Sequence, residues 1–482
     1  MAFAVSGRRM GAALISVAMA AVLIWFGTGL FPLWPLLWFA PVPVLVFAAR
    51  SSWRAAGVTA FVAWAAGNLN LWGYYTRTLH VPALAAIEID VVPALVFALA
   101  VLLFRALLRR GAAWTALLAF PAAWVSFEYV VNLNSPHGTA VSLSYSQLNF
   151  LPVLQLASIT GPWGIGFLLF SFSAALAIGI HLWKTDAKQA LRVVGATLGV
   201  LAAVLVFGAV RLALPPPPGN LVKVGMAASD LPANRDVAAP GAEADRLLRA
   251  YAEQAEALAA RGAQVIVLPE HLAELLDAQM GSVDALFQSI ADRTQTTIVV
   301  GVGHVEPDAR HNQARVYAPR AAALSYNKHH LLPPFESKYA PGTSVLTRPE
   351  ATGRWGVAIC KDMDFTRLSR EYGQAGAGLM LVPAWDFTVD RVSHGHMAVM
   401  RAVESGFGLA RAARGGFLTI TDNRGRILAE TESNSAAFAT LIADVPAVHD
   451  NTLYLLLGDW FAWVSLAMLA LVLARLFMRA GA

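Results

Sequence analysis

Long uncharged apolar runs fill most of the first 214 positions of the chain, and one more run lies near its C-terminus. A helix needs roughly 20 apolar residues to cross about 30 Å of hydrocarbon. Segments of this kind lie near residues 10–31, 33–49, 55–75, 83–105, 113–131, 162–182, 193–214 and 455–477. The pattern predicts a polytopic α-helical membrane bundle of about eight helices.

Residues 220–450 follow a different pattern, in which short β-rich runs alternate with helical ones. The predicted strands are Leu221–Ala227, Val265–Leu268, Thr297–Val302, Trp355–Ile359, Gly378–Val382 and Phe417–Thr421. We expect helices over Ala242–Arg261 and over 394–413. Such alternation is typical of an α/β domain. Polar residues fall just past several strand ends, where open α/β sheets place their sites.

Four consecutive prolines, Pro215 to Pro218, predict a stiff spacer between these two regions. We therefore divide the chain into three parts. An N-terminal transmembrane bundle of about seven helices covers residues 1–218, an α/β domain covers 219–450, and a C-terminal transmembrane helix lies in 451–482. The apolar run after Arg8 and Arg9 lacks a convincing cleavage site, so we expect the first helix to be retained.

The basic residues predict the orientation, because Lys and Arg gather in cytoplasmic loops. The clusters are Arg8 and Arg9; Arg50 and Arg54; Arg105, Arg109 and Arg110; Lys184, Lys188 and Arg192; and Arg475 and Arg479. All of them fall on one side when the N-terminus starts inside, and the loops at 77–80 and 132–150 fall outside. The α/β domain is then extracytoplasmic, which in a two-membrane bacterium means periplasmic, and the membrane is the inner one.

Composition supports a membrane chain, with 57% hydrophobic residues, 14% charged residues and a mean hydropathy of +0.54. The net charge of +5 is explained by the Lys and Arg residues that gather in cytoplasmic loops. No basic patch is interleaved with aromatic residues, so we expect no nucleic-acid partner. The single cysteine, Cys360, excludes an intramolecular disulfide.

Three residues of the types used in nucleophilic catalysis follow predicted strands: Glu270, Lys328 and Cys360. A thiol with a pKa of about 8.5 needs activation. A carboxylate can accept its proton, and a lysine can stabilise a thiolate and a developing oxyanion. Each residue alone also has an ordinary explanation. Cys360 could be a small buried hydrophobe, Glu270 a solvated loop residue, and Lys328 part of a surface turn. Their order within one α/β domain favours a catalytic set.

Other polar residues have simpler interpretations. His329 and His330, with His304 or His311, could suggest a metal, but no thiolate or carboxylate spacing completes a site, so we expect none. We expect His394 and His396 to be capping or loop residues. Glu128 lies in an apolar run, where a carboxylate is costly, and we expect it to contact a polar residue of the 132–149 loop.

Residues 220–450 resemble the nitrilase, or carbon–nitrogen hydrolase, superfamily. The motifs that carry the resemblance are Leu268-Pro269-Glu270; Tyr326-Asn327-Lys328 with Pro333, Phe335 and Glu336; and Ile359-Cys360-Lys361-Asp362 with Phe365. The resemblance implies an α-β-β-α sandwich with a Glu-Lys-Cys catalytic set.

The whole chain resembles the membrane branch of that superfamily, the apolipoprotein N-acyltransferases. The additional matching segments are Trp124–Tyr129, Ser144–Gln147, Gln155–Ser158, Gly161, Trp163, Gly164, Met397–Ala413 and Gly458–Trp460. This resemblance implies transfer of an acyl chain from a phospholipid, through a thioester, to the α-amino group of the diacylglyceryl-cysteine of a lipoprotein. No cofactor is implied.

The resemblance also implies the residue roles. Cys360 is the expected nucleophile, Glu270 the general base and then acid, and Lys328 the oxyanion stabiliser. Glu336 is expected to orient Lys328 or the acceptor amine, and the backbone amide of Lys361 to add a second oxyanion donor. Asp362 and Trp385 are further candidates for supporting or substrate-binding roles.

The chain departs from the family pattern in three places. Lys361-Asp362 replaces the usual Tyr-Glu, Val382-Pro383 replaces the Asn-Asp that commonly precedes Ala-Trp, and the interval from Lys328 to Cys360 is short. These departures bear on the acceptor more than on the thioester. Three alternatives stay open: a membrane-tethered amidase, an acyltransferase for another amine, and a catalytically silent assembly or transport protein.

Overall fold

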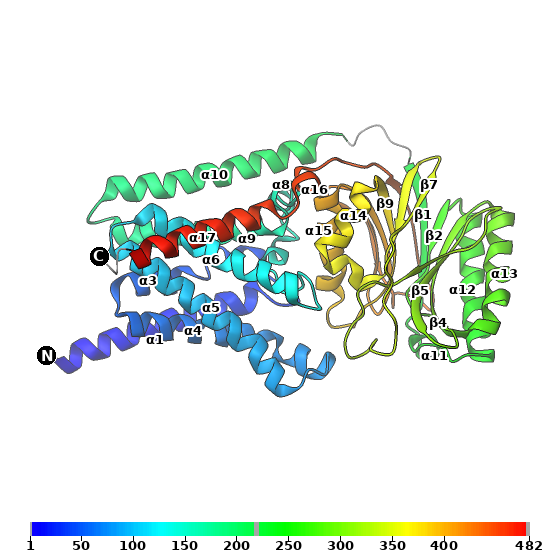
Figure 1. The fold of residues 1–482 in the computed structure, drawn as a ribbon, viewed down its shortest axis with the longest axis horizontal. Helices are drawn as coiled ribbons and strands as arrows, with labels where there is room; N and C mark the ends of the chain where they lie inside the picture. The colour runs from blue at the N-terminus through cyan, green and yellow to red at the C-terminus, as the bar shows by residue number, and fades with distance from the viewer. Residues whose placement is uncertain (1, 216–220, 479–482) are drawn as a thin grey trace. The chain divides into compact units, whose positions relative to one another are not determined.

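A computed structural model describes residues 2–215 and 221–478 (Figure 1). The chain forms two compact units. The helical unit comprises Met1–Leu133, Val141–Arg211 and Asp459–Ala482, and the α/β unit comprises Asn134–Ala140 and Leu212–Gly458. Residues 216–218 of the expected spacer, the expected boundary at 218/219 and Arg479 of the last basic cluster lie outside the described residues.

The helical unit is built from apolar helices. Those that fall in the predicted spans are α1 (Ala2–Gly27), α2 (Trp34–Leu37), α3 (Val42–Arg50), α4 (Trp53–Asn68), α5 (Ala83–Arg109), α6 (Ala113–Asn134), α9 (Pro162–Leu182), α10 (Ala187–Ala213) and α17 (Trp460–Met478). Among the described residues, five stretches are long and apolar enough to cross a membrane: Arg9–Gly27 and the helices α5, α6, α9 and α10.

The remaining predicted spans are shorter or interrupted. The span at 33–49 is divided, because α2 ends at Leu37 and α3 begins at Val42, with Pro41 before it and Pro43 in its first turn. Helix α4 ends at Asn68, before the predicted end at 75. The fold is polytopic and helical as predicted, and the count of about eight spans stays a prediction.

Glu128 shows how the bundle accommodates a buried carboxylate. Its Oε1 accepts hydrogen bonds from Trp124 Nε1 at 2.9 Å and from the Leu143 amide at 2.8 Å, and its Oε2 accepts one from Ser142 Oγ at 3.1 Å. A buried carboxylate is tolerated when it is hydrogen-bonded in this way. The expected structural contact with the 132–149 loop is confirmed.

Two sheets form the centre of the α/β unit. In the described residues the first sheet has the order β13-β1-β2-β4-β5-β6, with β3 also paired to β4, and the second has the order β12-β11-β10-β9-β8-β7. The strands of the first are β1 (Leu221–Ala228), β2 (Val265–Val267), β3 (Glu274–Leu276), β4 (Thr297–Val305), β5 (Arg310–Tyr317), β6 (Leu324–Asn327) and β13 (Ala439–Pro446). Those of the second are β7 (Leu346–Glu350), β8 (Gly353–Val357), β9 (Ala377–Trp385), β10 (Gly408–Arg414), β11 (Phe417–Thr421) and β12 (Ile427–Glu432).

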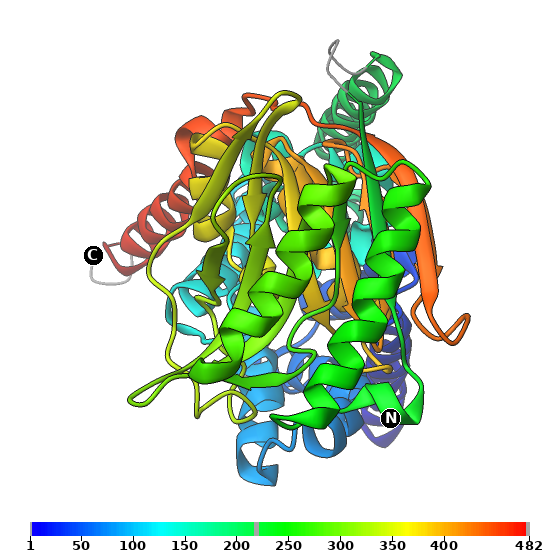
Figure 2. The same cartoon turned by 90° about the vertical axis from the view of Figure 1, so that its right-hand side faces the viewer.

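Helices cover the outer face of each sheet (Figures 1 and 2). The first sheet packs against α12 (Ala242–Ala260) and α13 (Asp277–Thr294), and the second against α14 (Thr366–Gln374) and α15 (Arg391–Ser405). Helix α12 buries one apolar stripe at the spacing of a helix face, which consists of Ala244, Leu247, Leu248, Tyr251, Ala252, Ala255 and Leu258. The α-β-β-α sandwich expected from the resemblance is therefore present.

The parallel strands at the middle of each sheet direct their carboxyl ends to one edge. In the first sheet β1, β2 and β4 run parallel, and in the second β8, β9 and β10 do. The amide of Glu270, past the end of β2, donates to the carbonyl of Ala384 on β9 at 3.3 Å and so joins the two sheets at this edge. Open sheets place their sites at such an edge.

The predicted helix over 394–413 is wrong in its second half. Helix α15 ends at Ser405, Gly406 adopts a φ of 74°, and its amide donates to the Ala402 carbonyl. A glycine in the left-handed region terminates a helix at little cost. The chain then enters β10, which pairs with β9, so Arg411 lies on a buried strand rather than on a helix.

Candidate active site

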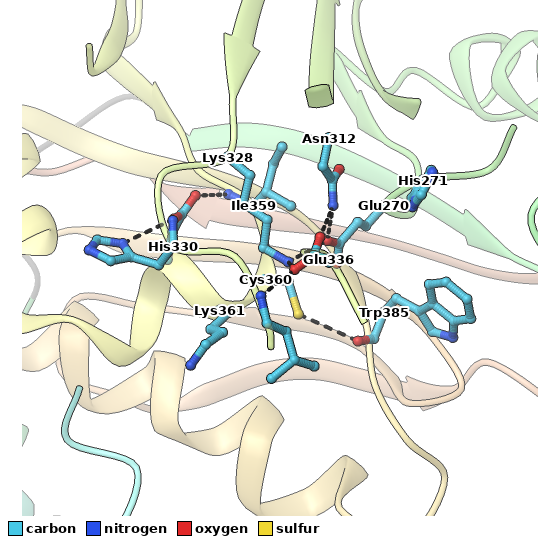
Figure 3. Close-up of polar contacts among 12 residues, drawn as sticks. Glu270, His271, Asn312, Lys328, His330, Glu336, Ile359, Cys360, Lys361 and Trp385 are labelled. Atoms are coloured by element: carbon cyan, nitrogen blue, oxygen red, sulfur yellow. Dashed lines mark hydrogen bonds and ion pairs between the residues drawn. The ribbon is translucent and has the colours of Figure 1, made fainter. Parts of the chain in front are cut away.

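The candidate site lies where the ends of β2, β6, β8 and β9 converge, and it is buried. Glu270 follows β2, Lys328 follows β6, Cys360 follows β8 and Trp385 ends β9. Glu270, Lys328 and Cys360 are each less than 5% exposed. Figure 3 shows the carboxylates of Glu270 and Glu336 together with the Lys328 ammonium beside the sulfur. The structure therefore brings the three predicted catalytic side chains together.

Lys328 is held between two carboxylates. Its Nζ lies 2.7 Å from Glu270 Oε1 and 2.8 Å from Glu336 Oε2. Asn312 Nδ2 donates to Oε1 of both carboxylates, at 2.7 Å for Glu270 and 2.5 Å for Glu336. Oε2 of Glu270 has no hydrogen-bond partner among the described residues. Oε1 of Glu270 thus positions Lys328 and Asn312, and Oε2 is available to accept a proton.

Charge and burial set the protonation states of this group. Burial, together with the neighbouring Glu336, raises the pKa of Glu270, against the opposing effect of Lys328. Although burial opposes the ammonium, Glu270 and Glu336 hold the pKa of Lys328 well above its ordinary value. A carboxylate with a raised pKa is a better proton acceptor near neutral pH. The lysine keeps its positive charge throughout.

Cys360 sits on a sharp turn after β8. Its backbone has a φ of 43°, in the left-handed region, and the short helix Cys360–Asp364 follows. The thiol donates to the Trp385 carbonyl at 3.4 Å. Burial and the charge of Glu270 raise the pKa of Cys360, whereas Lys328 and Arg411 lower it. The resting group is therefore a thiol.

A largely buried ionic network next to the sulfur was not predicted from the sequence. Arg411 donates to both oxygens of Asp386, and its Nη2 lies 4.0 Å from Cys360 Sγ. His394 Nδ1 lies 2.8 Å from Asp386 and its Nε2 lies 3.5 Å from Asp364. Although burial opposes it, the two carboxylates raise the pKa of His394 to about 10. The expected role of His394 as a capping or loop residue is corrected: it lies in the first turns of α15, partly buried, with its ring between two carboxylates.

Cys360, Asp386 and His394 also place one potential metal ligand atom each within 4.8 Å of one another. The chemistry of the group favours the ionic network over a metal. The Arg411 guanidinium already supplies the cation between Asp386 and the sulfur. The sequence signal for this network was Asp386, directly after the Ala384-Trp385 pair, and Arg411 in the matching 397–413 segment.

Asp362 connects the lysine loop to the cysteine turn. Its Oδ1 accepts from the amides of His329 and His330, and its Oδ2 accepts from Tyr326 Oη and the Ile359 amide, at 2.8 to 3.1 Å. The side chain has no exposed surface. Asp362 therefore holds the segment after β6 and the Cys360 turn together, and its role in catalysis stays a prediction.

Lys361 extends away from the Cys360 sulfur (Figure 3). Its Nζ lies 3.2 Å from His137 Nδ1 and 3.9 Å from Asp364. The amide and hydroxyl of Thr139 both donate to the Asp364 carbonyl, at 3.1 and 2.8 Å. Burial, and then the charge of Lys361, lower the pKa of His137 to about 4, so His137 accepts a hydrogen bond as a neutral ring. The segment Asn134–Ala140 is thus part of the α/β unit.

Trp385 presents its ring at the edge of the site. Trp385 is 39% exposed, and the Arg414 guanidinium lies 3.8 Å from its ring centroid. Phe335, which is 41% exposed, lies 5.4 Å from Phe387 between ring centroids. Trp385 therefore places partly exposed aromatic surface beside a group of polar side chains (Figure 3).

Sequence and structure comparisons identify similar proteins over both units. Residues 20–175 match the family described as the apolipoprotein N-acyltransferase N-terminal domain, and residues 234–449 match the carbon-nitrogen hydrolase family. An apolipoprotein N-acyltransferase of Geobacter metallireducens is 28% identical over 92% of this chain and 91% of its own length. One of Gloeobacter violaceus is 26% identical over 62% of each chain. A crystal structure of an amidase from Nesterenkonia sp. is similar over 49% of this chain and 95% of the amidase, with 20% identity and a TM-score of 0.41.

Proposed function

Because the chain belongs to the apolipoprotein N-acyltransferase family, the membrane branch of the nitrilase superfamily, we propose that it acylates lipoproteins through a thioester on Cys360. The acyl donor is a phospholipid, and the acceptor is the α-amino group of a diacylglyceryl-cysteine. The observation that carries the proposal is Lys328 held between Glu270 and Glu336 beside a single buried thiol.

In the first half-reaction the Cys360 sulfur attacks the ester carbonyl of the phospholipid. The thiol proton passes to Glu270, whose Oε2 has no other hydrogen-bond partner among the described residues. The Lys328 ammonium stabilises the oxyanion that develops on the carbonyl oxygen. The carbon–oxygen bond of the ester then breaks, and Glu270 returns the proton to the departing alkoxide. The products are the acyl-cysteine thioester and a lysophospholipid.

In the second half-reaction the neutral amine of the lipoprotein attacks the thioester carbonyl. Glu270 accepts the proton that the nitrogen loses on forming the amide, and Lys328 again stabilises the oxyanion. The carbon–sulfur bond breaks and Cys360 recovers its proton. A thioester suits this task because it reacts readily with amines, provided that water is kept away.

The apolar helices fit substrates that are anchored in lipid. Both proposed substrates carry acyl chains in the outer leaflet, so the thiol must work near the membrane surface. The distribution of Lys and Arg along the chain supports a bacterial inner-membrane location with the α/β unit in the periplasm. The exposed rings of Trp385 and Phe335 offer apolar surface for acyl chains.

The test is intact-mass spectrometry of the purified protein after incubation with phospholipid vesicles. We expect one added acyl mass on the wild type, none on Cys360→Ser and a much slower gain on Glu270→Gln. Addition of a diacylated lipopeptide should remove the acyl mass and give a triacylated peptide. A wild-type protein that never gains the mass would overturn the proposal.

The same experiment separates the alternatives. Release of free fatty acid with no triacylated peptide would indicate a membrane-tethered hydrolase. Transfer to a small amine but not to the lipopeptide would indicate a different acceptor. A Cys360→Ser variant that behaves as the wild type in every assay would indicate a catalytically silent protein.

A further inference from the structure

The turn that carries Glu270 contains one residue more than regular pairing with β4 allows. The Pro269 carbonyl accepts from the Gly301 amide at 3.2 Å, and the Gly301 carbonyl accepts from the Leu272 amide at 2.9 Å. A regular parallel pair would use the amide two residues after Pro269, that of His271, so the segment forms a bulge of one residue. A bulge changes the direction in which a neighbouring side chain points, and the neighbouring residue here is Glu270.

His271 occupies the bulge in a conformation that is costly for a residue with a side chain. Its φ is 53°, in the left-handed region. Such a backbone persists only when the surrounding structure fixes it, and it is found most often at functional sites. Because His271 follows Glu270 directly, the contacts that fix the backbone of His271 also fix that of Glu270.

Two glycines of β4 leave room for this turn. A Cβ atom on Gly301 would lie 2.5 Å from the Glu270 Cα, and one on Gly303 would lie 2.6 Å from His271 Nε2. Both distances are well inside van der Waals contact. The bulge therefore lies directly against β4, and a side chain at either glycine would displace it.

Hydrogen bonds hold both the ring and the carbonyl of His271. Its Nε2 lies 2.9 Å from Tyr339 Oη, and the Tyr339 hydroxyl donates to Glu274 Oε1 at 2.7 Å. Since the single phenolic hydrogen goes to Glu274, Nε2 of His271 is the donor to Tyr339. The His271 carbonyl accepts from Arg414 Nη2 at 2.8 Å. Burial, and then the charge of Arg414, lower the pKa of His271 to about 3, so the ring is neutral.

We propose that His271 is a positioning residue for Glu270: its ring, anchored on Tyr339, holds the bulge in the conformation that keeps the Glu270 carboxylate beside Cys360. This role rests on the proposed function of Glu270 as the general base. The His271 side chain points away from the sulfur (Figure 3), so it acts through Glu270 and takes no proton itself. Without the anchor, the strained backbone relaxes and carries the carboxylate away from the thiol.

The pH profile of Cys360 alkylation reports the position of this carboxylate without any acyl transfer. Burial and then the charges of Glu270 and Asp386 raise the pKa of Cys360, whereas Lys328 and Arg411 lower it. When the Glu270 carboxylate moves away, the midpoint of the iodoacetamide rate profile therefore moves to lower pH. The plateau rate reports access to the thiol, so a fold that is merely loosened changes the plateau and leaves the midpoint in place.

Five variants of the full chain in detergent make the test. Glu270→Gln should lower the midpoint by about one pH unit, and His271→Gly and Tyr339→Phe should each lower it by about half a unit. His271→Gln should keep the wild-type midpoint, because its amide can donate to the same hydroxyl. Gln295→Gly is the matched control and should leave the midpoint unchanged, since Gln295 also has a left-handed φ, of 55°, but lies at the end of α13.

Two further measurements complete the test. His271→Gly should keep the wild-type circular dichroism, because glycine adopts this φ without strain, and it should slow acylation by phospholipid about tenfold. An unchanged midpoint in both His271→Gly and Tyr339→Phe would overturn the role of His271, and so would an unchanged midpoint in Glu270→Gln. A wild type that shows these midpoints but is never acylated would instead overturn the proposed function alone.

Discussion

The guanidinium of Arg411 lies 4.0 Å from the sulfur of Cys360 while it also donates to both oxygens of Asp386. Two positive charges, those of Lys328 and Arg411, therefore act on the sulfur, and both lower the pKa of Cys360 against the effect of burial. Asp386 fixes the guanidinium in place, so Arg411 is a positioning and electrostatic residue rather than a proton donor.

Arg411→Leu should make the thiol less reactive. Loss of the cation leaves Asp386 beside the sulfur and raises the pKa of Cys360 further. One pKa unit corresponds to about a tenfold smaller thiolate fraction, so we expect at least that loss in the rate of alkylation by iodoacetamide at pH 8. The rate profile against pH should move to higher pH. Arg401→Leu is the matched control, since Arg401 is equally buried and pairs with Glu404 at 2.8 Å. A similar shift in the control would remove the specific role of Arg411.

Glu270→Gln and Glu336→Gln should separate proton transfer from positioning. Glutamine at 270 cannot take the thiol proton, so single-turnover acylation should fall by about 10² to 10⁴. Glutamine at 336 can still accept from Lys328 and the Leu332 amide, which now bond to Oε2 at 2.8 and 2.7 Å. We expect a loss of only about tenfold. Equal losses in the acyl mass assay would contradict the assigned roles.

Asp362→Asn should destabilise the α/β unit and slow acylation together. The asparagine side chain has one accepting oxygen and one donating NH₂ group. The NH₂ group must therefore face donors, either the His329 and His330 amides or the Ile359 amide and the Tyr326 hydroxyl. Losing charged hydrogen bonds at a buried site costs about 3 kcal/mol, which thermal unfolding in detergent would register as a lower Tm. Tyr326→Phe removes the contact with Asp362 at 2.8 Å and the hydrogen bond between the Tyr326 and Tyr372 hydroxyls, and should cost about 2 kcal/mol. An unchanged Tm for Asp362→Asn would show that the loop and the turn are held by other contacts.

His394 should make stability depend on pH. Its pKa is raised from 6.5 to about 10 in the folded protein, because Asp364 and Asp386 outweigh the effect of burial. A raised pKa contributes stability that is fully present below pH 6.5 and is lost as pH rises toward 10. The Tm difference between the wild type and His394→Gln should therefore be largest at pH 6 and should shrink up to pH 10. A difference that grows with pH would mean that the ring is neutral.

Local patterns were sufficient for the framework of the site. The β-rich runs before Glu270 and Cys360 predicted the strands β2 and β8, and the structure brings both residues to one edge with Lys328. Each of these residues follows a strand in the sequence, so its place at the sheet edge follows from local structure and from the parallel direction of the strands.

The supporting residues could not be predicted in the same way. Asn312 lies within β5 among other polar residues, and nothing in that run indicates the two carboxylates that it contacts. Arg411 was placed on a helix because the 394–413 segment is apolar enough for either structure. The pairing of β10 with β9 is a long-range contact, and only Gly406 marked the end of the helix locally.

The inclusion of Asn134–Ala140 in the α/β unit affects how the protein can be dissected. A soluble fragment that begins after the proline run would lack His137 and Thr139, which leaves the Lys361 ammonium and the Asp364 carbonyl without these contacts directly behind the nucleophile turn. Such a truncated version should express poorly or aggregate. Supplying the seven-residue stretch in trans, or grafting it onto the fragment, would be the way to recover a water-soluble form for crystallisation.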